Sequence, residues 1–300
     1  MDHPTLEIIA RLAWSADVPH TLVEVPPRGD LALPAAAPVP ALPTIRLGLD
    51  GAIGVVNLRD GGVPAPAQLA WTTIVDGGAP AWHHAPSPWP PASAGPVDVW
   101  IDRGGALVLL ETAPGARGAA TRLAVVEPTG AARVTELTDG PFVRLVADGA
   151  GQLFAVRHGA APALVPVDLA TGARGAARAL TPGSRLALAA NRGAALTPAA
   201  LADDGTARVA APPALGQALV FMVGADADDR YYSVVDGSLA EVSFDGRLRH
   251  QVALAAVPGL LTTGSRLAAP TAWQVDAAGR VVMARGDATG FELVRLTLPR

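Results

Sequence analysis

The chain of 300 residues contains no cysteine, and because all 23 of its basic residues are arginine it contains no lysine either. The lack of cysteine excludes a disulfide framework, thiolate catalysis, cysteine-ligated zinc and iron–sulfur clusters. The lack of lysine excludes Schiff-base chemistry and a phosphate-binding loop of the lysine type. The fold must therefore rest on apolar burial, and 50% of the residues are apolar, enough for a sizeable core.

Long runs of charge or of apolar residues are also missing. The formal net charge is −4 and the arginines are scattered, so no basic stripe predicts a nucleic-acid partner. No apolar run approaches the ~20 residues of a membrane span. Residues 1–4 show neither the basic nor the apolar region of a signal peptide. We expect a cytoplasmic protein, and the arginine-only, alanine-rich composition is typical of a GC-rich bacterium.

Glycine and proline are abundant instead, with 32 and 28 residues. Glycine turns separate strand-length apolar runs, which is typical of an all-β protein. One series of these turns, which includes Gly51, Gly104 and Gly279, recurs about every 46 residues, and a second series lies between its members. A period of about 40–50 residues with four short strands is that of a propeller blade. We predict a six-bladed β-propeller.

The strands of most blades can be assigned. The second blade is expected at residues 97–103, 106–111, 122–127 and 131–137, and the fifth at 220–226, 230–235, 239–244 and 247–254. The fourth, residues 184–213, is short and alanine-rich. The sixth has only three strands, at 273–276, 280–285 and 291–298. We therefore expect a strand at residues 21–25 to complete it, which closes the ring and removes two exposed strand edges.

Two segments lie outside the repeat. Residues 4–14 predict a short N-terminal helix, with Leu6, Ile9 and either Leu12 or Ala13 on one face. Residues 31–43 carry four prolines and predict an extended linker. The expected organisation is a helical appendage at residues 1–20, the closing strand and proline-rich linker at 21–43, and the propeller at 44–300, which forms a single domain with residues 21–26.

The blades share a local pattern of a first strand that ends in aspartate, a glycine turn and an aliphatic second strand. Residues 146–156 (Val-Ala-Asp-Gly-Ala-Gly-Gln-Leu-Phe-Ala-Val) show it most fully, and residues 275–282 show it next. The pattern resembles NHL-repeat and gluconolactonase-like six-bladed propellers over roughly residues 44–300. The resemblance implies the fold far more than an activity. It also implies a divalent metal held by carboxylate and asparagine ligands at the channel mouth.

That ligand set is not visible in the chain. Only two asparagines are present, Asn57 and Asn191, and no carboxylate lies at an obvious matching position inside a first strand. No serine lies in a G-x-S-x-G turn. We therefore predict no catalytic residue, no metal ligand and no cofactor.

The loops that join second to third strands are expected to meet at one rim of the central channel. Their charges would hold a small polar or anionic ligand, with Arg157 and Arg285 as the anion-binding pair. The predicted rim consists of Arg59, Asp60, Glu111, Arg157, His158, Asp236, Arg285 and Asp287. The alternative interpretation is ordinary solvated loop charge.

Residues 79–96 break the repeat with six prolines. We expect this stiff loop to protrude on the face of the rim and to bind a protein partner through Trp82, His83, His84 and Trp89, because tryptophan is frequent in interface hot spots. The alternative is that both tryptophans pack on the propeller as an apolar plug. The two histidines are adjacent, and adjacent residues on a strand point to opposite faces, which disfavours a shared metal.

The leading hypothesis is a non-enzymatic protein-interaction scaffold. One version is a structural part of a larger bacterial assembly, such as a contractile tail or secretion complex. The alternatives are a metal-dependent, lactonase-like hydrolase of a small sugar-like substrate and a propeller that senses a small ligand without turnover. Converging carboxylates at the channel mouth would favour the hydrolase, and a polar pocket without metal would favour the sensor.

Overall fold

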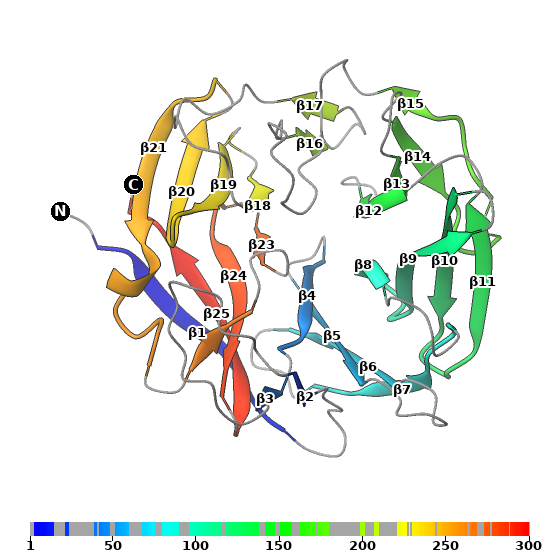
Figure 1. The fold of residues 1–300 in the computed structure, drawn as a ribbon, viewed down its shortest axis with the longest axis horizontal. Helices are drawn as coiled ribbons and strands as arrows, with labels where there is room; N and C mark the ends of the chain where they lie inside the picture. The colour runs from blue at the N-terminus through cyan, green and yellow to red at the C-terminus, as the bar shows by residue number, and fades with distance from the viewer. Residues whose placement is uncertain are drawn as a thin grey trace.

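In the computed structural model the chain forms a ring of β-sheets around a central axis (Figure 1). The structure describes residues 3–14, 22–23, 39–40, 42–48, 52–59, 68–75, 80–89, 96–115, 118–137, 142–147, 151–157, 163–171, 173–179, 199–201, 207–209, 221–226, 228, 230–243, 245–262, 265–268, 273–276, 278–287 and 289–299.

Four blades are antiparallel sheets whose four strands follow one another in the sequence. Blade 1 has β4 (Thr44–Leu47), β5 (Ile53–Arg59), β6 (Gln68–Ile74) and β7 (His83–Pro86). Blade 2 has β8 (Pro96–Ile101), β9 (Leu107–Gly115), β10 (Gly118–Val126) and β11 (Ala132–Leu137). Blade 3 has β12 (Phe142–Ala147), β13 (Leu153–Arg157), β14 (Ala163–Val167) and β15 (Arg178–Ala179). Blade 4 has β18 (Phe221–Ala225), β19 (Arg230–Val235), β20 (Ser238–Ser243) and β21 (Leu248–Ala253).

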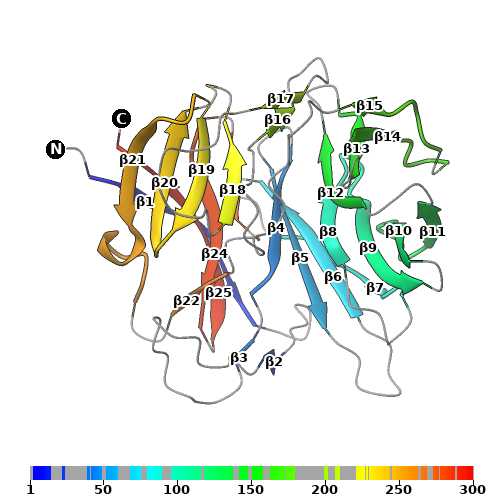
Figure 2. The same ribbon diagram turned by 45° about the horizontal axis from the view of Figure 1, so that its top comes forward.

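Blade 5 is built from both ends of the chain. Its sheet runs β1 (Thr5–Ala13), β25 (Gly290–Thr297), β24 (Val281–Gly286) and β22 (Arg266–Leu267), and β23 (Gln274–Val275) also pairs with β24. The three strands expected from residues 273–298 are therefore confirmed. Figure 2 shows β1 and β25 running side by side at the edge of the ring.

The described residues form five blades, so the prediction of six is wrong. Between blades 3 and 4 it describes only a two-stranded sheet, β16 (Ala199–Leu201) with β17 (Ala207–Val209). Both strands fall in the stretch predicted as a full blade, and the rest of that stretch lies outside the described residues. Alanine is depleted in strands because it offers little side chain to pack on a pleated surface.

The N-terminal helix prediction is also wrong, because residues 5–13 form strand β1, which pairs with β25. The spacing of Leu6, Ile9 and Leu12 suggested a helix, but the register shifts between Ile8 and Ala10. Such a bulge interrupts the alternation of a strand. Leu6, Ile9 and Leu12 all pack against the core as a result.

The ring is closed by the N-terminal region as expected, but by β1 rather than by residues 21–25. Within the predicted closing segment, β2 (Leu22–Val23) instead pairs with β3 (Val39–Pro40). Two ion pairs join directly opposed residues of the closing strands, Glu7 with Arg295 and Arg11 with Glu292. Arg285 of β24 also binds Glu292 (Nε to Oε2, 2.7 Å), which extends the network to a third strand.

Apolar side chains pack between neighbouring blades. One cluster joins blades 1, 4 and 5 through Ile45, Tyr232 and Trp273, and another joins blades 1 and 2 through Trp71 and Leu109. A third joins blades 2 and 3. Among the described residues the only helical turn is η1 (Leu254–Ala256), a 3₁₀ helix after blade 4, and no helix is long and apolar enough to cross a membrane.

The aspartate that ends a first strand organises the turn into the second strand. Asp226 accepts the N–H of Arg230 and pairs with its guanidinium at 2.7 Å, and Asp276 does the same for Arg280. Asp102 accepts the N–H of the residue four positions later at 2.8 Å. In blades 2, 4 and 5 the aspartate pattern of the sequence therefore reflects a local hydrogen-bonded turn.

Candidate ligand-binding cavity

The antiparallel strands divide the turns between two faces of the ring. Turns between first and second strands, and between third and fourth strands, lie at one face of the ring, which we call the 1–2 face. Turns between second and third strands lie at the opposite face, which we call the 2–3 face. A cavity of about 460 Å³ lies on the 1–2 face, where it is lined by residues of blades 1, 2 and 3.

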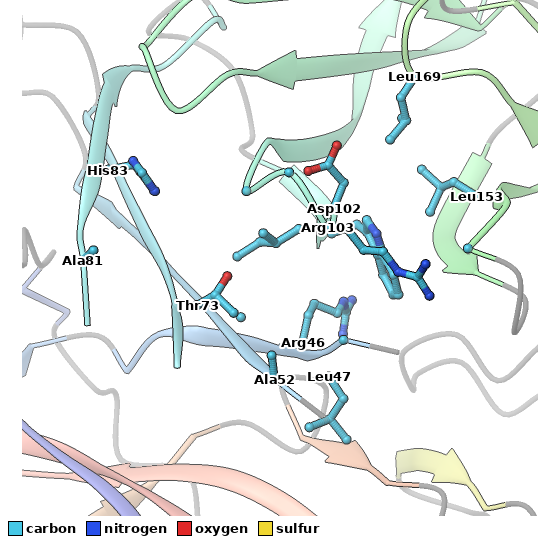
Figure 3. Close-up of a pocket in the computed structure, with 17 residues that line it drawn as sticks. Arg46, Leu47, Ala52, Thr73, Ala81, His83, Asp102, Arg103, Leu153 and Leu169 are labelled. Atoms are coloured by element: carbon cyan, nitrogen blue, oxygen red, sulfur yellow. The ribbon is translucent and has the colours of Figure 1, made fainter. Parts of the chain in front are cut away.

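The lining combines apolar and polar side chains. Figure 3 shows Ala81, Thr73 and His83 of blade 1 on one side and Leu153 and Leu169 of blade 3 on the other. Trp100 and the turn at residues 102–105 bring blade 2 into the lining. Three separate blades therefore build the wall of one cavity, which a chain segment alone could not form.

Arg46 of β4 is the most buried charged side chain of the lining, with 7% of its surface exposed. Its Nε donates a hydrogen bond to the Val99 carbonyl at 2.7 Å, and its Nη2 forms an ion pair with Asp98. Asp98 in turn accepts the N–H of Leu145 at 2.7 Å. One carboxylate thus links the first strands of blades 1, 2 and 3 and holds Arg46 in place.

Two factors oppose the positive charge of Arg46, which its ion pair with Asp98 supports. Burial, with a smaller contribution from the nearby positive charge of Arg144, lowers the pKa of Arg46 to about 9. Burial also lowers the pKa of Arg144. Arg46 Nη1 is buried and has no hydrogen-bond partner within the described structure.

The turn at residues 102–105 forms the blade 2 side of the cavity. Gly105 has a φ of 82°, a conformation that favours glycine, and its carbonyl accepts the Trp71 Nε1–H at 2.9 Å. The rings of Trp71 and His83 lie with centroids 5.5 Å apart. Arg103 is exposed and forms no ion pair with any residue that the structure describes. The lining thus offers one buried and one solvated guanidinium.

The predicted partner loop is largely part of the propeller. Residues 83–86 form β7, the outer strand of blade 1, rather than a protruding loop. Trp89 is 7% exposed and belongs to the cluster between blades 1 and 2, and Trp82 packs against the core. His83 lines the cavity while His84 is exposed, so the two point apart. The packing agrees with the apolar plug, and partner binding through these residues stays a prediction.

The described residues of the predicted rim lie on the 2–3 face, opposite the cavity, and several of them have structural partners. Arg285 binds Glu292 and the carbonyls of Gly259 and Leu260. Asp287 accepts hydrogen bonds from the Thr289 hydroxyl and from the Thr289 N–H, and these bonds lower its pKa. Asp236, with a φ of 47°, forms a two-residue hairpin turn with Gly237, for which Asp–Gly is a preferred pair.

Glu111 and Arg157 complete the described rim. Glu111 is fully buried, both of its carboxylate oxygens have no hydrogen-bond partner, and burial raises its pKa. Arg157 ends β13 and is half-buried. The side chain of Arg59 and all of Asp60 and His158 lie outside the described residues. Ligand binding by the rim therefore stays a prediction.

Sequence reasoning missed Arg46, Asp98 and Arg103. A signal was present, because Arg46 and Asp98 are charged residues inside short apolar strands, and such residues are rarely buried unless they are paired. Their pairing could not be seen, since they lie 52 positions apart on different blades. In the described part of the chain, no group of three or more histidine, aspartate or glutamate residues is placed to hold a metal ion.

Comparisons with known proteins find similarity to solved structures only. No protein-family profile and no curated protein matches the chain. Similar solved structures include a subtype N10 neuraminidase-like protein of A/little yellow-shouldered bat/Guatemala (10% identity, 88% of this chain and 80% of that chain, TM-score 0.37). They also include an endo-arabinase from Bacteroides thetaiotaomicron (12% identity, 86% and 94%, TM-score 0.33) and a candidate gluconolactonase (13% identity, 98% and 93%, TM-score 0.33). At these TM-scores they carry no functional argument, and the propeller architecture rests on the sheet topology.

Proposed function

We propose that this propeller is a binding protein that holds a small molecule, without turnover, in the cavity between blades 1, 2 and 3. The observation that carries the proposal is the cavity itself, whose volume of about 460 Å³ falls within the range of about 300–1,000 Å³ that small-molecule sites occupy. Its lining combines apolar side chains, such as Trp100 and Leu153, with polar groups that could orient a ligand.

The two competing hypotheses have less support. The scaffold hypothesis relied on two apolar segments outside the repeat, and both pack into the propeller as β1 and around β7. The lactonase-like hypothesis requires clustered carboxylates, and Asp102 is the only acidic residue of the lining that the structure describes. Metal analysis of the purified protein tests the hydrolase directly, because a stoichiometric calcium, zinc or manganese ion would favour it.

Thermal shift measurements of the full chain against a small-molecule library test the binding proposal. A ligand at 100 times its Kd stabilises the folded state by about 2.7 kcal/mol, which moves the Tm by several degrees. We expect the Ala81→Trp variant to abolish the shift, because Ala81 is exposed and lines the cavity. Ala132→Trp, at an exposed position of β11, is the matched control and should keep it. A library without a ligand, or ligand shifts that survive Ala81→Trp, would refute the proposal.

A further inference from the structure

The turn between β8 and β9 presents two accessible charges of opposite sign to the cavity. Asp102 and Arg103 are neighbours in this turn, and both line the cavity. Arg103 is exposed and Asp102 is half-buried, and in the described part of the chain neither forms an ion pair. The other guanidinium of the lining, that of Arg46, is buried and already paired with Asp98. The carboxylate and the guanidinium that a ligand can reach in the described lining are therefore those of this turn.

Asp102 lacks an arginine partner that the equivalent aspartates of two other blades have. In each turn the aspartate carboxylate accepts the N–H of the residue four positions later. Asp226 and Asp276 also bind, through Oδ2, the Nε of an arginine at that position, at 2.7 Å in both turns. In blade 2 the same position is Ala106, so Asp102 Oδ2 binds no side chain that the structure describes. The free oxygen marks a place for a positive group that the chain itself does not supply.

The missing arginine would project toward the cavity side of blade 2. Ala106 belongs to the apolar cluster between blades 2 and 3. Leu153 of blade 3 belongs to the same cluster and also lines the cavity. A ligand ammonium in the cavity can therefore bind Asp102 where a guanidinium binds the equivalent aspartates, and the bond would be charge-assisted.

Arg103 requires that the ligand also carry a negative charge. A ligand with an ammonium alone would be repelled by this guanidinium, and a ligand with a carboxylate alone would be repelled by Asp102. A ligand with both groups avoids the two repulsions, and the planar guanidinium binds carboxylates in a bidentate manner. Because Asp102 and Arg103 are adjacent in the turn, the two charges of the ligand must lie close together.

The rest of the lining suits an apolar side chain. Leu153 is buried, and Trp100 and Leu169 are half-buried at the cavity wall. We propose that the cavity binds a free α-amino acid with an apolar side chain, its ammonium on Asp102 Oδ2 and its carboxylate on Arg103. In such a molecule the two groups are bonded to one carbon atom, and at neutral pH both are charged. The inference rests on the ligand-binding function proposed above.

Titration calorimetry of the full chain with matched compounds tests the inference. The first set is L-phenylalanine, 3-phenylpropanoate, which lacks the ammonium, and 2-phenylethylamine, which lacks the carboxylate. The second set, L-leucine, 4-methylpentanoate and 3-methylbutylamine, repeats the comparison with a smaller side chain. We expect an amino acid to bind at least tenfold more tightly than either of its analogues. An analogue that binds as tightly as its amino acid overturns the inference.

Single variants assign each charge. Asp102→Asn keeps an acceptor for the Ala106 N–H, and we expect it to lower the preference for the amino acid over the carboxylate analogue to about one. The preference over the amine should stay, because the amino acid and the amine lose the same interaction. Arg103→Gln should have the opposite effect, with the preference over the amine lost and the preference over the carboxylate kept. A general loss of folding would not produce this pattern.

Matched controls lie away from the cavity lining. Asp276→Asn changes the equivalent aspartate of blade 5, and Arg249→Gln changes an exposed arginine of β21. Both should leave the two preferences unchanged. A variant of Asp102 or Arg103 that changes both preferences alike, or neither, overturns the assignment of the charges.

A crystal structure of the unaltered protein with the amino acid that binds more tightly locates the ligand independently. The inference requires the ammonium within hydrogen-bond distance of Asp102 and the carboxylate within hydrogen-bond distance of Arg103, and any other placement overturns it. Failure of both amino acids to bind also overturns it. The proposed ligand-binding function falls only if the small-molecule library yields no ligand either.

Discussion

Replacement of Asp98 by alanine should be among the most damaging single changes in the inner ring. Asp98 is 5% exposed, pairs with Arg46 and accepts the N–H of Leu145, so its removal affects three blades at once. Breaking a buried ion pair typically costs about 3–5 kcal/mol, because the remaining charge is left without a partner. A loss of about 4 kcal/mol corresponds to a decrease in Tm of about 10 °C for a chain of this size class.

Urea is the appropriate denaturant for this measurement, because it does not screen charge. Two further variants separate the contributions. Asp98→Asn keeps an acceptor for the Leu145 N–H and should be less destabilising than Asp98→Ala by about 1 kcal/mol. Arg46→Met with Asp98→Leu replaces the pair by apolar side chains, and it should lose less stability than Asp98→Ala alone, since no buried charge is left unpaired.

The reasoning would be refuted by either of two results. A loss below about 1 kcal/mol for Asp98→Ala would mean that the pair does not behave as a buried one. The second result concerns Arg46→Met with Asp98→Leu. If its loss of unfolding free energy equals the sum of the losses of Arg46→Met and Asp98→Leu measured singly, Arg46 and Asp98 act independently, whereas residues in direct contact are expected to be coupled.

Three other predictions concern the turns, the closure and the buried acid. Gly279→Ala should be more destabilising in urea unfolding than Gly237→Ala. Both glycines have a positive φ, but a Cβ at Gly279 would lie 2.7 Å from Asp226 Oδ2, whereas a Cβ at Gly237 would have no atom within 4 Å. Gly237→Ala should cost about 1–2 kcal/mol, and an equal loss of stability in both variants would exclude the clash. Removal of residues 1–14 should expose the edge of β25 and cause aggregation, which light scattering measures. A peptide of residues 3–14 should suppress this aggregation. A truncated protein that stays monomeric and unfolds cooperatively would contradict the role of β1. Burial raises the folded-state pKa of Glu111 above its unfolded-state value. The neutral acid therefore stabilises the fold below the unfolded-state pKa, and this stabilisation is lost as the pH rises through the folded-state pKa. We expect Glu111→Gln to lack this decrease of the free energy of unfolding with rising pH. Unfolding at pH 4 and pH 8 measures this, and an identical pH dependence in both proteins would speak against a buried neutral acid.

The parts of the fold that could be predicted from the sequence depend on residues close together in the chain. The second blade was expected to begin near residue 97 and end at residue 137, and β8 begins at Pro96 and β11 ends at Leu137. The turn aspartates were visible because Asp226 and Asp276 bind groups within four positions. The helix prediction failed because of the bulge between Ile8 and Ala10, which disturbed the strand alternation in the sequence.

The candidate site was less predictable. The predicted rim was chosen as the charges of the loops between second and third strands, and Arg285 is 8% exposed and bound to Glu292 within blade 5. The cavity lies on the other face, where its lining joins three blades. A sequence pattern shows which residues share a strand, but it does not show which strands of different blades approach one another.

The sequence by itself determined an all-β propeller, because the turns and the strand alternation repeat over short distances and need no partner elsewhere in the chain. It also excluded thiol and lysine chemistry through composition alone. Only the tertiary structure decided the number of blades, the strand that closes the ring and the place of the cavity. These depend on the packing of distant segments, as in the contact of Arg46 with Asp98, since burial and ion pairing arise only when separate blades come together.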